Sequence, residues 1–252
     1  MNLRLCLGIL VALFGDAAFA KCESNGLLLF PAPGGVLPTN TRFILEGVGR
    51  EQTRVVALAG KRLVLKSNDD EVLVRVQPGW VSSQKRAAVK LIPARPLKPR
   101  RTYTLEWERA LPRARLLNGA PGSGEATWLT GKGEDLSLPT WSDLPTAVEG
   151  RYDKDGDAVT QVVKLRSPLV DDAPAYLVVE MRRLPRGRDV QAYFVPVSGG
   201  QAELGHDACG GSFSFETGAS YRAVLEARDA ADNAAENRLA VTLSAPAVPK
   251  SK

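Results

Sequence analysis

Residues 102–108 read TYTLEWE, and residues 220–228 read SYRAVLEAR. In both stretches every second residue from the tyrosine is apolar, and most residues between them are polar or charged. A period of two is the pattern of a β-strand with one face on a core and the other in water. Each stretch lies near the end of its half of the chain. The same late strand is therefore predicted twice, in two β-rich halves.

Short strands with turn residues between them are predicted throughout both halves. In the first half they cover residues 27–30, 42–47, 54–58, 62–66, 71–77, 86–92, 102–108 and 126–130. In the second half they cover residues 147–151, 159–166, 175–182, 190–197, 212–216, 220–228 and 238–244. Many short strands at this spacing, separated by Gly, Pro, Asn and Asp, are typical of a β-sandwich. The sequence therefore predicts an all-β fold.

The chain of 252 residues is long enough for two ordinary domains. We expect two tandem β-sandwich domains after an N-terminal signal peptide. Their predicted boundaries are residues 1–20 for the signal peptide, 21–130 for the first domain, 131–145 for a linker, 146–245 for the second domain and 246–252 for a tail. The linker is rich in Gly and charged residues and then carries Pro139 and Trp141, which predicts a semi-rigid joint.

Three further motifs are PAPGGVLPTNT at residues 31–41, LIPARPLKPRRTY at 91–103 and EARDAADN at 226–233. All three resemble motifs of bacterial Ig-like domains. The last is similar to the late hairpin of Ig-like and fibronectin-type domains, with Asp232 where those domains usually have Gly. The tyrosine that enters each late strand is similar to the tyrosine corner of Ig-like sandwiches. The resemblance implies tandem Ig-like sandwiches in which these motifs shape loops and carry no chemistry.

The N-terminus predicts export. Arg4 precedes an apolar run of about ten residues, and Ala18-Phe19-Ala20 forms a small-x-small cleavage site. The run is too short to span a membrane, and no later apolar run approaches twenty residues. We therefore expect an exported protein, in the periplasm or at the cell surface, with no transmembrane segment.

Positive charge is gathered in three clusters, and the net charge of the chain is +5. The clusters cover residues 98–101, 109–115 and 182–188. They indicate either solvated loops or attraction to acidic polysaccharide, lipopolysaccharide or anionic lipid. Nucleic acid is not an expected partner after export, and no aromatic-basic stacking pattern supports it. The expected partners are proteins or acidic glycans at the cell envelope.

Two cysteines remain after removal of the signal peptide, which contains Cys6. In an exported protein, Cys22 and Cys209 suggest one disulfide. The alternatives are two free thiols or a bridge between molecules.

An acidic stretch at residues 153–157 is the candidate metal site, with Asp153, Asp155 and Asp157 at alternate positions. Alternating carboxylates in a loop can converge on Ca²⁺, with help from Asp171, Asp172, Asp229 or Asp232. The stretch is not an EF-hand, because Ala158 takes the place of the required Gly and Lys164 that of the closing Glu. The alternative is an acidic turn between two strands, and no other cofactor is expected.

The leading functional hypothesis is a non-enzymatic binding, adhesion or spacer module of a bacterial cell envelope. The chain contains one histidine, His206, and no Gly-x-Ser-x-Gly motif, so no catalytic residues are assigned. One alternative is a periplasmic pilus-type chaperone, which also has two Ig-like domains. The other is a hydrolase that uses His206.

Overall fold

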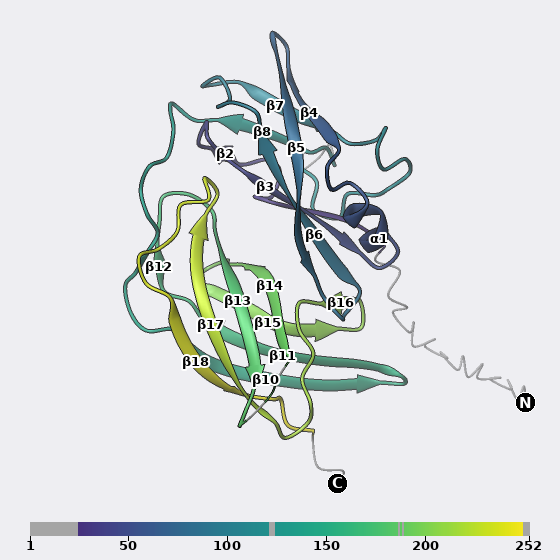
Figure 1. The fold of residues 1–252 in the computed structure, drawn as a ribbon, viewed down its shortest axis with the longest axis vertical. Helices are drawn as coiled ribbons and strands as arrows, with labels where there is room; N and C mark the ends of the chain where they lie inside the picture. The colour runs from purple at the N-terminus through teal and green to yellow at the C-terminus, as the bar shows by residue number, and fades with distance from the viewer. Residues whose placement is uncertain (1–24, 121–123, 186, 188, 249–252) are drawn as a thin grey trace, which may run out of the picture.

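The computed structural model describes residues 25–120, 124–185, 187 and 189–248. The predicted signal peptide at residues 1–20, Cys22, and residues 249–252 of the predicted tail lie outside the described residues. Within the described part, the chain forms β-strands and one short α-helix, which confirms the prediction of an all-β fold. The two halves of the chain are stacked along the long axis of the molecule (Figure 1).

The N-terminal half forms one mixed sheet of eight strands in the order β1-β3-β6-β5-β4-β7-β8-β2. All neighbours are antiparallel except β2 and β8, which are parallel. The elements are β1 (Gly26–Phe30), β2 (Val36–Leu37), β3 (Phe43–Val48), α1 (Glu51–Val56), β4 (Arg62–Ser67), β5 (Asp70–Val81), β6 (Arg86–Pro93), β7 (Thr102–Glu106) and β8 (Thr127–Thr130).

This sheet folds back on itself and encloses its own core. The rings of Phe43 on β3 and Trp128 on β8 are 4.7 Å apart, although four strands separate β3 from β8 in the sheet order. Alternate residues of the strands, such as Leu63 and Leu65 on β4, point into the same hydrophobic cluster. The apolar residues that alternate along these strands therefore fill the core of one closed sandwich.

The C-terminal half is a sandwich of two four-stranded sheets, in the orders β10-β11-β15-β16 and β14-β13-β17-β18, with β9 and β12 paired beside them. Its strands are β9 (Thr140–Trp141), β10 (Thr146–Asp155), β11 (Ala158–Arg166), β12 (Leu169–Val170), β13 (Ala175–Arg183), β14 (Val190–Pro196), β15 (Gln201–Asp207), β16 (Gly210–Gly211), β17 (Ser220–Asp229) and β18 (Leu239–Ser244). Leu165 and Leu204 from one sheet share a core with Leu177 and Leu225 from the other. The count of two independently folding domains stays a prediction.

Tyr103 and Tyr221 occupy equivalent positions in the two halves. Both are buried, and each hydroxyl accepts a hydrogen bond from the backbone N–H five residues earlier. The donors are Lys98, at 3.0 Å, and Glu216, at 2.7 Å. This is the arrangement of a tyrosine corner, which closes the loop before a late strand.

The strand predicted at residues 54–58 is wrong, because Glu51–Val56 forms helix α1. Arg54 is paired with Glu51 one turn earlier, at 2.8 Å, which stabilises a helix and has no counterpart in a strand. The helix packs directly on β3 at Gly47, where an added Cβ would lie 2.5 Å from the Glu51 carbonyl oxygen. Val55 is buried through this close approach. Tertiary packing therefore overrides the strand preference of a β-branched run.

Two further predictions were wrong in the sheet regions. Residues 212–216 form no strand, because this segment does not pair with a neighbouring strand. Phe213 and Phe215 are nevertheless buried, as the alternation predicted. The strand that pairs with β11 in this region is β15, which was not predicted from the sequence. Strand β5 also continues beyond the predicted end at residue 77, through Pro78 and Gly79, by means of a register shift between Pro78 and Trp80.

Candidate functional site

The junction between the two halves is a buried aromatic layer. Phe30 and Trp80 from the N-terminal half meet Tyr176, Tyr193 and Phe194 from β13 and β14. The ring of Phe30 is 5.2 Å from that of Tyr176, and Trp80 is 5.4 Å from Phe194. Aromatic pairs at these separations add to the free energy of burial. The two halves therefore share part of one hydrophobic core.

An ionisable pair is buried inside this layer. Tyr193 donates a 2.8 Å hydrogen bond to Oε1 of Glu46, and both residues are at most 5% exposed. Arg86, on the neighbouring strand β6 and opposite Val48, lies 3.5 Å from Oε2 of the same carboxylate. Burial raises the pKa of Glu46, although the charge of Arg86 and the hydrogen bond from Tyr193 act against the rise.

A cleft of about 450 Å³ opens beside this pair, between the two halves. Its volume falls in the range of small-ligand sites. It is lined by Leu28, Leu29, Phe30, Glu46, Arg86, Asn118, Val162, Tyr193, Phe194, Val195, Pro196, Ser198, Gln201, Glu203, Leu204, Gly205, His206, Asp207, Gly210, Gly211 and Ser212. The Nε atom of Arg86 is buried and has no hydrogen-bond acceptor among the residues that the structure describes. Arg86 therefore places a cationic side chain in the lining of the cleft.

His206, the one histidine of the sequence, also lines the cleft. Its Nδ1 lies 3.2 Å from the carbonyl oxygen of Phe213. The hydroxyl of Ser212, which lies nearby in sequence and in the same cleft, is directed to the backbone of Gly205. Asp207 accepts a hydrogen bond from the backbone N–H of Cys209. These three polar side chains thus contact backbone groups and form no hydrogen bonds with one another.

Further polar contacts connect the two halves. Arg42 is paired with Asp232 at 2.6 Å, and Asp232 also accepts a 2.9 Å hydrogen bond from Tyr176. In addition, the hydroxyl of Ser82 donates to the carbonyl of Gly211 at 2.6 Å, and the N–H of Gly211 donates to the carbonyl of Gln84. Figure 1 shows the lower ends of β5 and β6 next to β16.

A second candidate site is a group of three carboxylates, Asp135, Asp171 and Asp229. One carboxylate oxygen from each lies within 4.8 Å of the others. Asp135 belongs to the segment that joins the halves, Asp171 follows β12, and Asp229 ends β17. Burial raises the pKa of Asp229 to about 6, and the charges of Asp171 and Asp135 add to the rise, against hydrogen bonds from Asn233.

Asp232 lies three residues from Asp229, but its pKa is shifted in the opposite direction. Burial would raise its pKa, but the hydrogen bond from Tyr176 and the charges of Lys90 and Arg228 outweigh burial and lower it. Asp232 therefore serves as an ion-pair partner at the junction.

The predicted metal ligands Asp153, Asp155 and Asp157 lie at the tip of the β10–β11 hairpin, and all three are exposed. They do not belong to the group of three carboxylates found within the described residues. Of the helper residues named from the sequence, the structure brings together Asp171 and Asp229. Asp135, the third carboxylate of the group, was not predicted, because nothing in the sequence marks it except its position in a charged linker.

Cys209 is disulfide-bonded. The other cysteines of the sequence, Cys6 and Cys22, lie outside the described residues, so the pairing of Cys22 with Cys209 stays a prediction.

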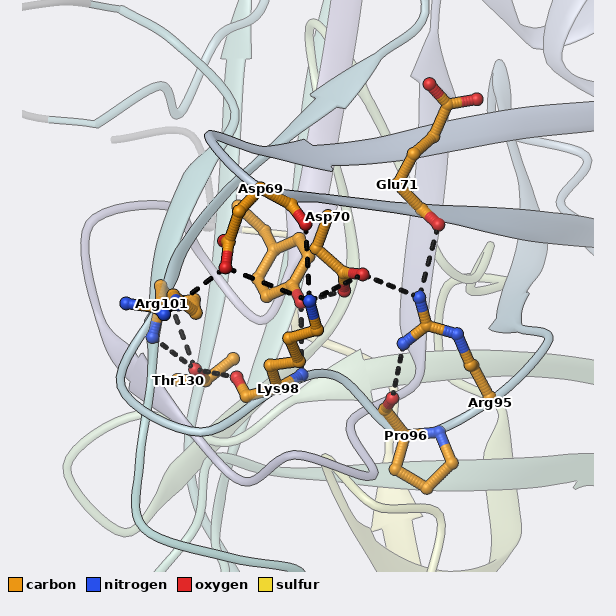
Figure 2. A network of polar contacts seen from close by, with 9 residues as sticks. Asp69, Asp70, Glu71, Arg95, Pro96, Lys98, Arg101 and Thr130 are labelled. Atoms are coloured by element: carbon orange, nitrogen blue, oxygen red, sulfur yellow. Dashed lines mark hydrogen bonds and ion pairs between the residues drawn. The ribbon is translucent and has the colours of Figure 1, made fainter.

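The basic cluster at residues 98–101 belongs to a polar network around the first tyrosine corner (Figure 2). Asp70 accepts hydrogen bonds from Arg95 at 2.7 Å and Tyr103 at 2.5 Å. Lys98 lies 3.3 Å from Asp70, and Arg101 pairs with the neighbouring Asp69 at 3.3 Å. The hydrogen bond from Arg95, followed by that from Tyr103, holds the pKa of Asp70 far below its usual value. Lys98 and Arg101 thus have carboxylate partners within the chain.

Glu46, Arg86 and Tyr193 were not singled out from the sequence. One signal was present, because Glu46 is a lone charge in the otherwise apolar run FILEGV at Phe43–Val48. A charged residue in such a run is rarely buried without a partner. The partner could not be found from spacing, since Tyr193 lies 147 residues away.

Comparison with known proteins gives no family for this chain. No protein-family model matches the sequence, and no curated protein matches it. Among solved structures, the N-terminal part of the bacterial S-layer protein SbsC matches with a TM-score of 0.23 and 10% identity, over 86% of this chain and 43% of that one. CBD12 from CALX1.2 matches with a TM-score of 0.22 and 11% identity, over 82% of each chain. At these TM-scores neither likeness is evidence for a shared fold or function.

Within the described residues, no helix has the length and hydropathy needed to cross a membrane. What the structure defines is an all-β protein with a sandwich in each half, a buried junction and a cleft between the halves.

Proposed function

We propose that this protein is a non-enzymatic, exported binding module of a bacterial cell envelope, with its ligand site in the cleft between the two halves. The observation that carries the proposal is Arg86 in the lining of the cleft, whose Nε has no acceptor among the described residues. The Arg86 side chain is 25% exposed and lines the cleft, so its guanidinium can donate to a ligand oxygen there. Arg86 offers donors to oxygen acceptors, whereas Glu46, Glu203 and Asp207 in the lining repel a strongly anionic ligand. The ligand class that fits the cleft is therefore an envelope glycan with oxygen acceptors.

Two further observations support this function. The aromatic layer and its polar contacts keep the walls of the cleft in place, so little entropy is lost when a ligand binds. The side chains of His206 and Ser212 contact backbone groups, an arrangement that favours structural roles over nucleophilic catalysis. Export and the envelope location rest on the signal-peptide pattern at residues 1–20.

The test measures binding of acidic and neutral envelope oligosaccharides to the full chain by titration calorimetry. Gln201 is exposed and lines the cleft, so Gln201→Trp should obstruct the cleft and abolish oligosaccharide binding. Gln77 is also an exposed strand glutamine but lies outside the cleft, so Gln77→Trp should bind like the native protein. Equal binding by all three proteins would refute the cleft as the site. Hydrolysis of the oligosaccharide that disappears in His206→Ala would instead support the enzyme alternative.

A further inference from the structure

Three separate segments bring carboxylates to one point beside the joint between the halves. Asp135, Asp171 and Asp229 are far apart in sequence, yet one oxygen from each lies within 4.8 Å of the others. Asp229 is fully buried, and the other two are half-buried. Like charges at such separations repel each other strongly where water is partly excluded. A positive charge, from a proton or a bound cation, relieves this repulsion.

Asp171 adds a second, independent observation. Its Oδ1 accepts a 2.8 Å hydrogen bond from the backbone N–H of Ala173. Its Oδ2 is shielded from solvent and has no hydrogen-bond donor in the described part of the chain. A shielded carboxylate oxygen without a donor costs free energy unless a ligand contacts it. This oxygen therefore points to a bound group that is positively charged or donates hydrogen bonds.

No side chain supplies that charge within the described residues, where none of the three carboxylates forms an ion pair. The nearest basic residue in sequence, Arg228, is directed to Glu226 and Asp232 instead. Asn233 donates to Asp229 from its backbone and its side chain, which orients the carboxylate but leaves its charge in place.

We propose that Asp135, Asp171 and Asp229 bind a hard divalent cation, with Ca²⁺ as the expected ion. All three ligands offer oxygen, without the nitrogen or sulfur that zinc and other transition metals favour. Three carboxylates supply between three and six oxygens, and water can complete the six to eight that Ca²⁺ takes. This site is separate from the cleft and does not depend on the proposed function.

The position of the site indicates what the cation does. The main chain of Asp135 is held from both halves, because its carbonyl accepts hydrogen bonds from Asn40 at 2.8 Å and from Asn233 at 3.1 Å. Its N–H donates to the side chain of Asn40 at 2.9 Å. A cation bound to Asp135, Asp171 and Asp229 therefore ties the connecting segment to the C-terminal half and stiffens the joint.

The test uses the full chain, stripped of metal with a chelator and titrated with CaCl₂ by calorimetry, with thermal unfolding measured in parallel. Ca²⁺ should bind with a Kd of about 1 mM or tighter, the range of extracellular calcium modules, and should raise the Tm. Asp171→Asn keeps the side-chain volume but removes the charge. It should weaken Ca²⁺ binding at least about tenfold and abolish the Tm shift, because a lost charged ligand lowers the affinity of such a site.

The matched control is the exposed hairpin, where the double variant Asp153→Asn/Asp155→Asn should bind Ca²⁺ like the native protein. Circular dichroism checks that Asp171→Asn is folded, and Asp135→Asn provides a second variant on the connecting segment. No binding heat and no Tm shift at CaCl₂ concentrations up to about 10 mM, beyond the range of such modules, would overturn the proposal. Loss of binding in the hairpin variant with retention in Asp171→Asn would also overturn it.

Discussion

The hydroxyl of Tyr193 donates a 2.8 Å hydrogen bond to Oε1 of Glu46, across the junction between the two halves of the chain. Tyr193 lies on β14 and Glu46 on β3, and both side chains are buried. A buried carboxylate is costly without donors, so this contact is specific to one relative position of the halves. The junction therefore combines non-directional apolar burial with a directional polar contact.

Tyr193→Phe tests the contribution of this contact to stability. The substitution keeps the ring and removes one of the two groups that stabilise the Glu46 carboxylate. We expect a loss of about 1–3 kcal/mol in the free energy of unfolding, measured with urea at neutral pH. Tyr152→Phe on the β10–β11 hairpin is the control and should change stability by less than about 0.5 kcal/mol. Equal effects of the two substitutions would show that the buried hydrogen bond contributes nothing.

Glu46 should make part of the stability depend on pH. Its pKa in the folded protein is raised above 4.5, chiefly by burial, so the folded state holds this proton to a higher pH than the unfolded state. Stability from this group is therefore full below 4.5 and falls as pH rises from 4.5 through the raised pKa. Glu46→Gln should match the native protein at low pH and become the more stable of the two as pH rises. If the Glu46→Gln protein is instead less stable than the native protein at neutral pH, then the attraction between Arg86 and the Glu46 carboxylate outweighs the cost of burying that carboxylate.

Asp70 predicts the opposite dependence on pH. Its pKa is lowered below 3.8, first by the hydrogen bond from Arg95 and then by that from Tyr103. Stability from this carboxylate is therefore present above 3.8 and is lost as pH falls through the lower, folded-state pKa. Asp70→Asn should cost about 1–3 kcal/mol at neutral pH, and the difference should shrink in acid.

Asp69 provides the control for Asp70 in the same network (Figure 2). Its side chain is 49% exposed, against 6% for Asp70, and it pairs with Arg101 at the surface. Asp69→Asn should therefore cost less than about 1 kcal/mol. A larger loss for Asp69→Asn than for Asp70→Asn, measured by urea unfolding, would contradict the network as described.

The tyrosine corners predict a sharp contrast between adjacent residues. Tyr221 is buried and bonded to the backbone of Glu216, whereas Arg222 is exposed on the other face of β17. Tyr221→Ala should cost about 3–5 kcal/mol, as for other large aromatic truncations. Arg222→Ala should change stability by less than about 0.5 kcal/mol. Similar losses at both positions in urea unfolding would contradict the register of β17. Tyr103→Ala and Thr104→Ala provide the same comparison in the N-terminal half.

Features that depend on near neighbours in the chain could be predicted from the sequence. The alternation at residues 62–66, 102–108 and 220–228 identified strands correctly, because side chains two apart share a face of the sheet. The same reasoning located the late tyrosines, whose hydroxyls bond only five residues back. It failed for residues 54–58, where a β-branched run forms helix α1 against Gly47.

By itself, the sequence determined that the protein is all-β and where most strands lie, since a period of two is a local property. Tertiary structure alone decided which polar residues meet. Glu46 finds Tyr193 across the junction, and Asp171 joins Asp135 and Asp229, while Asp153, Asp155 and Asp157 stay apart at an exposed hairpin tip despite their spacing. These meetings depend on strand order and on how the halves stack. Topology sets such contacts between distant segments, and spacing along the chain carries no record of them.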